Sequence, residues 1–229
     1  AFRHFFKPAP MPEAGAPIED VQVKRGFLGI KRVKVTRPFS RSGPAVQEKL
    51  RRTRIAMPRA MNVYSTAPYF RTYFESIGLP KQNVLFSDAT TEEMWVEGGK
   101  YGSVDPCYPS KVCQAHIHNL LFHYHSEKKP LSYIFFPVMT HVPSFGEGVM
   151  DKTSCPIVAG VPNVMKAAFT KEVDFFAQRG IEYVDTPLTF SEMHLTARRM
   201  FETWGPRLGI TEDESDHAHK EGMRALAQF

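Results

Sequence analysis

The sequence lacks the marks of several large protein classes. It contains no Gly-x-x-x-x-Gly-Lys-Ser/Thr loop, no Gly-x-Gly-x-x-Gly fingerprint and no Gly-x-Ser-x-Gly elbow. The common motifs for nucleotide binding, dinucleotide binding and serine hydrolysis are therefore absent. No apolar run approaches the ~18 residues that a membrane-spanning helix needs, and no signal peptide is recognisable. We expect a protein that does not enter a membrane.

Cysteine is scarce, with 3 among 229 residues, and no two of them form a Cys-x-x-Cys pair. An odd number excludes a complete set of intrachain disulfides, so we expect a cytoplasmic protein with reduced thiols. A hydrophobic content of 42% is typical of a folded domain. Because the sequence begins with Ala1 and stops inside a helical pattern at Phe229, we expect it to be part of a longer polypeptide.

The net charge of +5 is unevenly distributed. The excess of Lys and Arg lies in residues 1–59, and the remainder is slightly acidic. Prolines interrupt the first part of this region. We predict an irregular basic arm or linker over residues 1–52, with one or two short strands between Val21 and Val35. Nucleic-acid binding is not favoured, because a basic segment of this kind is usually solvated or docks onto a protein.

From residue 53 onward, short apolar strands alternate with helical segments, which predicts an α/β domain over residues 53–229. Strands are expected at 54–58, 84–87, 131–138, 156–160 and 181–184. Helices are expected at 62–77, 88–97, 110–124, 163–169, 190–204 and 211–228. This order predicts a mostly parallel sheet flanked by helices, and ligands of such sheets bind in the loops after the strands.

Two cysteine–proline corners are the most informative feature. Cys107 stands between Pro106 and Pro109 at the start of a predicted helix, where the helix dipole favours thiolate over thiol. Cys155 precedes Pro156 after a long loop, and this loop can bring it to the same edge of the sheet. The pair indicates a redox or metal site. Cys113 is expected inside the helix as a small core residue.

Histidines cluster after Cys107, and they raise the alternative of a zinc site. Such a site would use Cys107, Cys155 and either His116 or His141, since thiolate and imidazole are zinc ligands. His118, His123 and His125 are expected instead on a solvated face near the helix end.

An ordered set of motifs resembles a known family. The set comprises Arg54–Tyr64, Phe86-Ser87-Asp88, Cys107–Lys111 with His116, Phe136-Pro137 and Cys155-Pro156. Over residues 53–229 the chain resembles a domain of the large 2-hydroxyacyl-CoA dehydratase activase-like proteins, which are related to 2-hydroxyacyl-CoA dehydratase components and double-cubane-cluster proteins.

The resemblance implies a flavodoxin-like α/β fold whose loop cysteines hold an iron–sulfur cluster of the 4Fe-4S or double-cubane type. Cys107 and Cys155 match the family's cysteine positions, and a third ligand is expected beyond Phe229, so the cluster would be incomplete in this piece. His116, Lys111 and Arg59 would lie around the cluster. Ala115 stands where the family usually has glycine.

The implied function is that of a module in an ATP-coupled, low-potential electron-transfer reductase or dehydratase-like system. Its partners would be an ATP-dependent activase module, in cis or in trans, the downstream half of the parent chain and a second copy in a homodimer. The resemblance names no catalytic residue, and we do not expect this piece to be active alone. A non-enzymatic interaction or scaffold domain is the other alternative to the cluster.

Overall fold

The computed structural model describes residues 6–26, 29–101, 107–143, 148 and 152–229. Its centre is a four-stranded parallel sheet with the strand order β4-β3-β5-β7. The four strands are β3 (Ile55–Met57), β4 (Val84–Phe86), β5 (Tyr133–Phe135) and β7 (Glu182–Val184). The first of these strands in the chain therefore lies between the second and the third, which is the order of flavodoxin-like sheets. The predicted α/β, flavodoxin-like class is confirmed.

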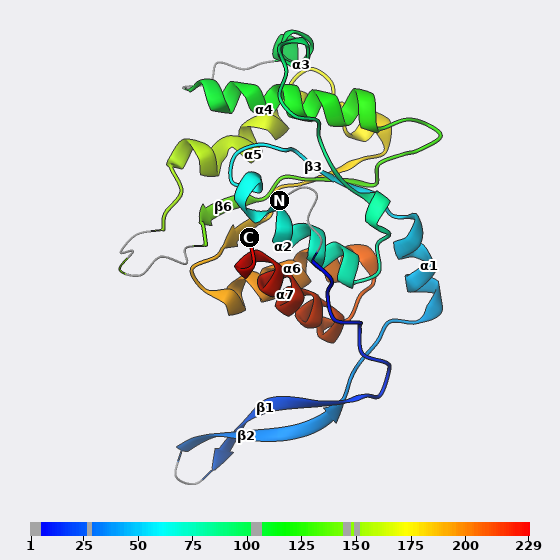
Figure 1. Cartoon of the computed structure of the whole chain (residues 1–229), viewed down its shortest axis with the longest axis vertical. Coiled ribbons are helices and arrows are strands. Elements are labelled where there is room, and N and C mark those ends of the chain that lie inside the picture. The colour runs from blue at the N-terminus through cyan, green and yellow to red at the C-terminus, as the bar shows by residue number, and fades with distance from the viewer. Residues whose placement is uncertain (1–5, 27–28, 102–106, 144–147, 149–151) are drawn as a thin grey trace.

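Helices cover both faces of this sheet (Figure 1). After β4 the chain changes its direction across the sheet, so right-handed crossovers place helices on opposite faces. One face carries α2 (Val63–Ser76), α6 (Met193–Leu208) and α7 (Glu212–Ala227). The other face carries α3 (Glu92–Gly98), α4 (Tyr108–Asn119) and α5 (Pro156–Thr170). Among the described residues, no helix combines the length and the apolar character that crossing a membrane requires.

The strand expected at 131–138 is divided at Pro137. β5 ends at Phe135, and a separate strand, β6 (Val138–His141), pairs in parallel with β8 (Pro187–Thr189). Proline has no N–H group to donate to a sheet ladder, so the break falls there. The short strand β8 was not predicted.

The prediction of a strand at 156–160 was wrong, because this segment is the start of α5. A short apolar run does not distinguish a buried strand from a buried helix by its periodicity. The helix is identified by its full length of 15 residues and by the buried side chains of Val161, Met165 and Phe169, which recur every four residues. Cys155 is therefore the N-cap of a helix.

The N-terminal arm is an antiparallel hairpin of β1 (Pro17–Gly26) and β2 (Gly29–Pro38), followed by α1 (Pro44–Arg52). Residues 27–28, at its expected turn, lie outside the described residues. The base of the hairpin is tied to α7 by Arg37, whose guanidinium donates to both carboxylate oxygens of Asp213 at 2.7 and 2.6 Å. The Arg37 hydrogen bonds hold the pKa of Asp213 below its usual value.

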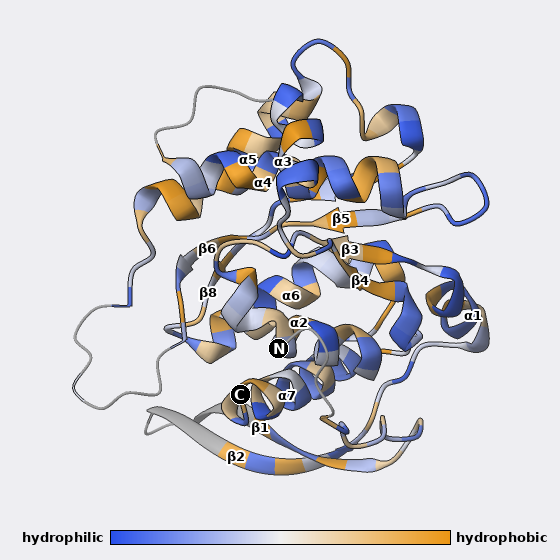
Figure 2. Ribbon diagram, turned by 45° about the horizontal axis from the view of Figure 1, so that its top comes forward, coloured by the Kyte–Doolittle hydropathy of each residue, from blue (hydrophilic) through white to orange (hydrophobic). Residues whose placement is uncertain are grey.

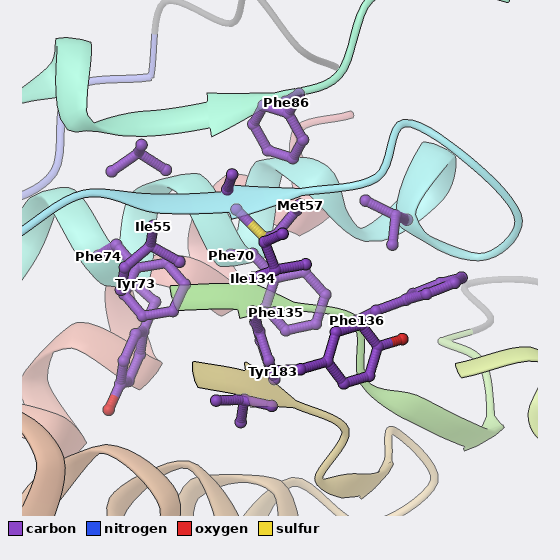
Figure 3. Packing of buried hydrophobic residues seen from close by; sticks show 14 of the residues in the cluster. Ile55, Met57, Phe70, Tyr73, Phe74, Phe86, Ile134, Phe135, Phe136 and Tyr183 are labelled. Carbon is purple, nitrogen blue, oxygen red and sulfur yellow. The ribbon is translucent and has the colours of Figure 1, made fainter. Parts of the chain in front are cut away.

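Hydrophobic segments concentrate in the sheet and on the inner sides of the helices (Figure 2). Between the sheet and α2, aromatic side chains pack edge to face (Figure 3). The Phe135 ring lies 5.3 Å from Phe70 and 5.2 Å from Trp204, and the Phe74 ring lies 5.0 Å from Trp204. Edge-to-face pairs stabilise a core beyond the effect of burial alone. This cluster holds α2 and α6 against the middle of the sheet.

Replacing Phe135 by alanine tests the importance of this cluster. Phe135 is 0% exposed, so Phe135→Ala should lower the free energy of unfolding by about 3–5 kcal/mol, through lost transfer energy and a cavity. Phe229→Ala is the matched control, because Phe229 is 63% exposed and its loss should change stability by less than ~0.5 kcal/mol. Urea unfolding followed by circular dichroism measures both values. Equal losses in the two variants would contradict the described core.

Candidate functional site

The carboxyl ends of β3, β4 and β5 meet at one edge of the sheet. The chain changes direction between β3 and β5, and ligands of doubly wound sheets bind at such a switch point. The loop Pro58–Asn62 follows β3 at this edge. Within it, Met61 has a φ of +50°, a left-handed conformation that is uncommon for residues other than glycine and clusters at functional sites. This loop is the centre of the candidate site.

Ser87, directly after β4, connects three elements at this edge. Its N–H donates to the Met57 carbonyl at 3.1 Å, and its hydroxyl oxygen accepts the Arg59 N–H at 2.7 Å. The same hydroxyl lies 2.7 Å from Nδ1 of His116 on α4. With the serine O–H donated to Nδ1, the Nε2–H of His116 donates to the Thr90 hydroxyl at 3.1 Å. The network fixes α4 relative to the loop.

His116 is only 1% exposed. Burial, supported by the positive charge of Arg59, lowers its pKa to about 4, although Asp88 acts in the opposite direction. The imidazole is therefore neutral at pH 7, and the neutral ring can accept from the Ser87 hydroxyl and donate to the Thr90 hydroxyl. His116 serves here to position α4, because its ring nitrogens face the hydroxyls of Ser87 and Thr90.

Cys107 is the N-cap of α4 and is partly exposed. The approach to it, including Pro106, lies outside the described residues. The first turn of α4 and the loop after β3 line a mainly apolar pocket of about 290 Å³. The lining residues are Ala60, Met61, Tyr64, Thr90, Tyr108, Pro109, Val112 and His116. The residue after Cys107 thus faces the same pocket as the loop Pro58–Asn62.

Cys155 is exposed and is the N-cap of α5. Its neighbour Ser154 is held in place by two bonds: its N–H donates to the Thr140 carbonyl at 2.8 Å, and its hydroxyl accepts from Asn62 Nδ2 at 2.9 Å. Asn62 belongs to the loop that also lies beside the start of α4. In Figure 1, α4 and α5 begin on the same side of the molecule. The residues next to both cysteines therefore lie beside one loop, at the starts of two neighbouring helices.

Two cations lie at this edge. The Arg59 guanidinium is 5.9 Å from the centre of the Tyr64 ring, one of the pocket residues. Lys111 is partly exposed in the first turn of α4, and its N–H donates to the Cys107 carbonyl at 3.3 Å. Arg59 and Lys111 give this edge a positive character that suits an anionic group.

The third cysteine and the two histidines considered as zinc ligands are less available to a metal than Cys107 and Cys155. Cys113 is fully buried, as expected, and its thiol donates to the Pro109 carbonyl at 3.5 Å. Both ring nitrogens of His116 have hydroxyl partners, and Nδ1 of His141 lies near the hydroxyls of Thr140 and Thr189. Among the residues with described positions, neither Cys107 nor Cys155 belongs to a group of three or more clustered metal ligands.

Sequence reasoning missed the polar residues that assemble this edge: Asn62, Ser87 and Ser154. Ser87 was placed at the end of a predicted strand and Asn62 at the start of a predicted helix, so their positions at the ends of elements were a usable signal. Nothing in the sequence indicated that Ser154, about ninety positions after Asn62, would bond to it.

The low pKa of His116 predicts a dependence of stability on pH. The unfolded chain binds a proton at this imidazole below pH ~6.5, whereas the folded chain does so only near pH 4. Folding stability is therefore lost as pH falls from ~6.5 to ~4, by on the order of 3 kcal/mol for this group. In His116→Gln the slope of unfolding free energy over this window should decrease. Exposed His194 supplies the control, His194→Gln, and an unchanged slope in His116→Gln would contradict the assignment.

Comparisons with known proteins bear on this site. No curated protein and no solved structure matches the chain. The model of one family, described as a CoA enzyme activase uncharacterised domain, matches residues 54–229. The match begins one residue before β3 and includes every residue of the site described above. The chain belongs to this family of CoA enzyme activase domains.

Proposed function

We propose that this domain is an iron–sulfur-associated module of an ATP-coupled, low-potential electron-transfer system of the 2-hydroxyacyl-CoA dehydratase type. One observation carries the proposal: Cys107 and Cys155 cap two neighbouring helices that begin beside the same loop. Membership in the CoA enzyme activase family supports the setting.

Cysteine thiols are the type of ligand that iron–sulfur clusters use. Clusters are held by cysteine thiolates, and the unpaired N–H groups at a helix N-terminus can donate to sulfur. Neither thiol is fully buried, so each can reach a ligand. Two thiolates are fewer than the four that a 4Fe-4S cluster takes, so further ligands come from outside this chain, from the rest of a longer polypeptide or from a second copy. A bound cluster would supply one-electron transfer.

The neighbouring residues have distinct roles in this proposal. Arg59 and Lys111 offset the negative charge of a thiolate-bound cluster and attract an anionic partner. His116 positions α4, and with it Cys107, through Ser87 and Thr90. The pocket beside Tyr108 gives one side of the site a mainly apolar lining.

We expect the electron donor to be an ATP-dependent activase module, in the same polypeptide or in a separate one. The system would work in the cytoplasm, where thiols stay reduced.

A docking domain without a cluster is the second candidate. It is favoured by the N-terminal hairpin β1–β2, which projects from the α/β domain while its base is tied to α7 through Arg37 and Asp213 (Figure 1). Such an arm can contact a partner at a distance from the sheet.

Anaerobic reconstitution with iron and sulfide distinguishes the two candidates. The longer polypeptide, which supplies the remaining ligands, should turn brown and bind iron, and Cys107→Ala and Cys155→Ala in it should each lower the bound iron and the charge-transfer absorbance at least twofold. Cys113→Ala is the matched control, because it removes a buried thiol and should leave both quantities unchanged. A colourless, iron-free sample would contradict the proposal and favour the docking domain.

A further inference from the structure

A second group of potential ligands lies near the far end of α4, away from both cysteines. It consists of Glu97 on α3, His118 on α4 and His123 in the π-helical turn Leu120–Tyr124. One ligand atom from each residue lies within 4.8 Å of the other two, and His123 Nε2 is 3.0 Å from Glu97 Oε2. Among the described residues, this group alone brings three potential metal ligands so close together.

The π-helical turn explains why two histidines five positions apart face each other. In a regular α-helix, residues i and i+5 point about 140° apart. Here the backbone widens, and the His125 N–H donates to the Leu120 carbonyl at 3.1 Å, a bond across five residues. Because a wider turn contains more residues, His118 and His123 come to the same side. Single π-turns of this kind occur frequently at functional sites.

Glu97 reaches the histidines because α3 lies unusually close to α4. A Cβ atom on Gly98 would lie 2.3 Å from the Ala115 Cα, so only glycine permits this approach. Glu97 is the adjacent residue, and it extends over the exposed end of α4 toward His123. The close approach of two helices thus brings the carboxylate to the imidazoles.

The imidazole of His118 is held in a fixed position by packing. The solvated position expected for His118 was wrong: the residue is only 8% exposed, and its ring stacks on Phe122 with ring centres 4.4 Å apart and lies tilted against Tyr101 at 5.0 Å. His123 and Glu97 are half exposed, at 51% and 53%, which leaves the group open to an ion and to water.

The charged side chains near His118 have opposing effects on a bound cation. Lys100 and Arg179 lie close enough to His118 to disfavour a positive charge there, whereas Glu97 favours it. The Glu97 carboxylate offsets these positive charges, so its removal should weaken the binding of a cation.

We propose that Glu97, His118 and His123 form a binding site for a divalent transition metal, with Zn²⁺ as the best match. Two imidazoles and one carboxylate are a ligand set that zinc uses when water takes the fourth position. Ligands at ~2.0–2.1 Å in a tetrahedral arrangement lie about 3.3 Å apart, so small side-chain movements from the separations described here are sufficient. The site is independent of the cysteines.

The test is calorimetric titration of the full chain with Zn²⁺ in the Cys107→Ser/Cys155→Ser background, which removes the two accessible thiols. One Zn²⁺ should bind per chain. His123→Ala and Glu97→Gln should each weaken binding at least tenfold, and both positions are exposed enough for the fold to survive. His194→Ala is the matched control, because His194 is exposed and has a carboxylate neighbour, Glu192, at 3.6 Å, and it should not change the affinity.

Two outcomes would overturn the site. One is the absence of Zn²⁺ binding in the thiol-free background, and the other is equal affinity in His123→Ala and the parent protein. Binding of Co²⁺ to the parent protein, which keeps its cysteines, gives a second measurement. A site of imidazole and carboxylate ligands lacks the near-ultraviolet thiolate-to-cobalt band, whereas a site at Cys107 or Cys155 shows it. The result is therefore separable from iron binding at the cysteines.

Discussion

The parallel pairing of β3 with β4 on one side and β5 on the other is the constraint on which the site depends. It places the first strand of the domain between strands that come later, so the loops that leave β3 and β4 and the helices that begin beside them converge on one edge. The loop Pro58–Asn62 and the start of α4 line the same pocket beside Tyr108. Asn62 of this loop also donates a hydrogen bond to Ser154, just before α5. Without this pairing, Cys107 and Cys155 would have no common neighbour.

The helix α4 connects the two candidate sites. Its N-terminus begins at Cys107, its middle is fixed to the sheet edge by His116, and its end widens into the π-helical turn near His123. At 1.5 Å per residue, Cys107 and His118 are about 16 Å apart along the helix. Two ligands bound at these ends would share one rigid element without sharing any ligand atom. A shift of α4 would change both sites at once.

Much of the fold could be predicted from the sequence, because apolar strands and helix signals agree in β3, α2 and β4. The helix expected at 88–97 begins at Glu92 as α3, where Thr91 caps it by accepting the Met94 N–H. The start of α5 was mistaken for a strand, since a few apolar residues suit either element. The placement of both cysteines at helix starts follows the sequence only in part: Cys107 was expected there, whereas Cys155 was expected before a strand. The group of Glu97, His118 and His123 could not be predicted, because it depends on a π-turn and on a helix contact at Gly98 that no periodicity encodes.

In the proposed site, the two accessible thiols open onto one shared edge of the sheet. Cross-linking of the reduced, folded chain with a short bis-maleimide, followed by peptide mass analysis, measures this most directly. We expect an intramolecular link between the peptides of Cys107 and Cys155, formed at low protein concentration and lost on unfolding in urea, with Cys113 unmodified in the folded state. If each thiol reacts singly and no link between them forms, the shared edge, and with it the proposed cluster site, is contradicted.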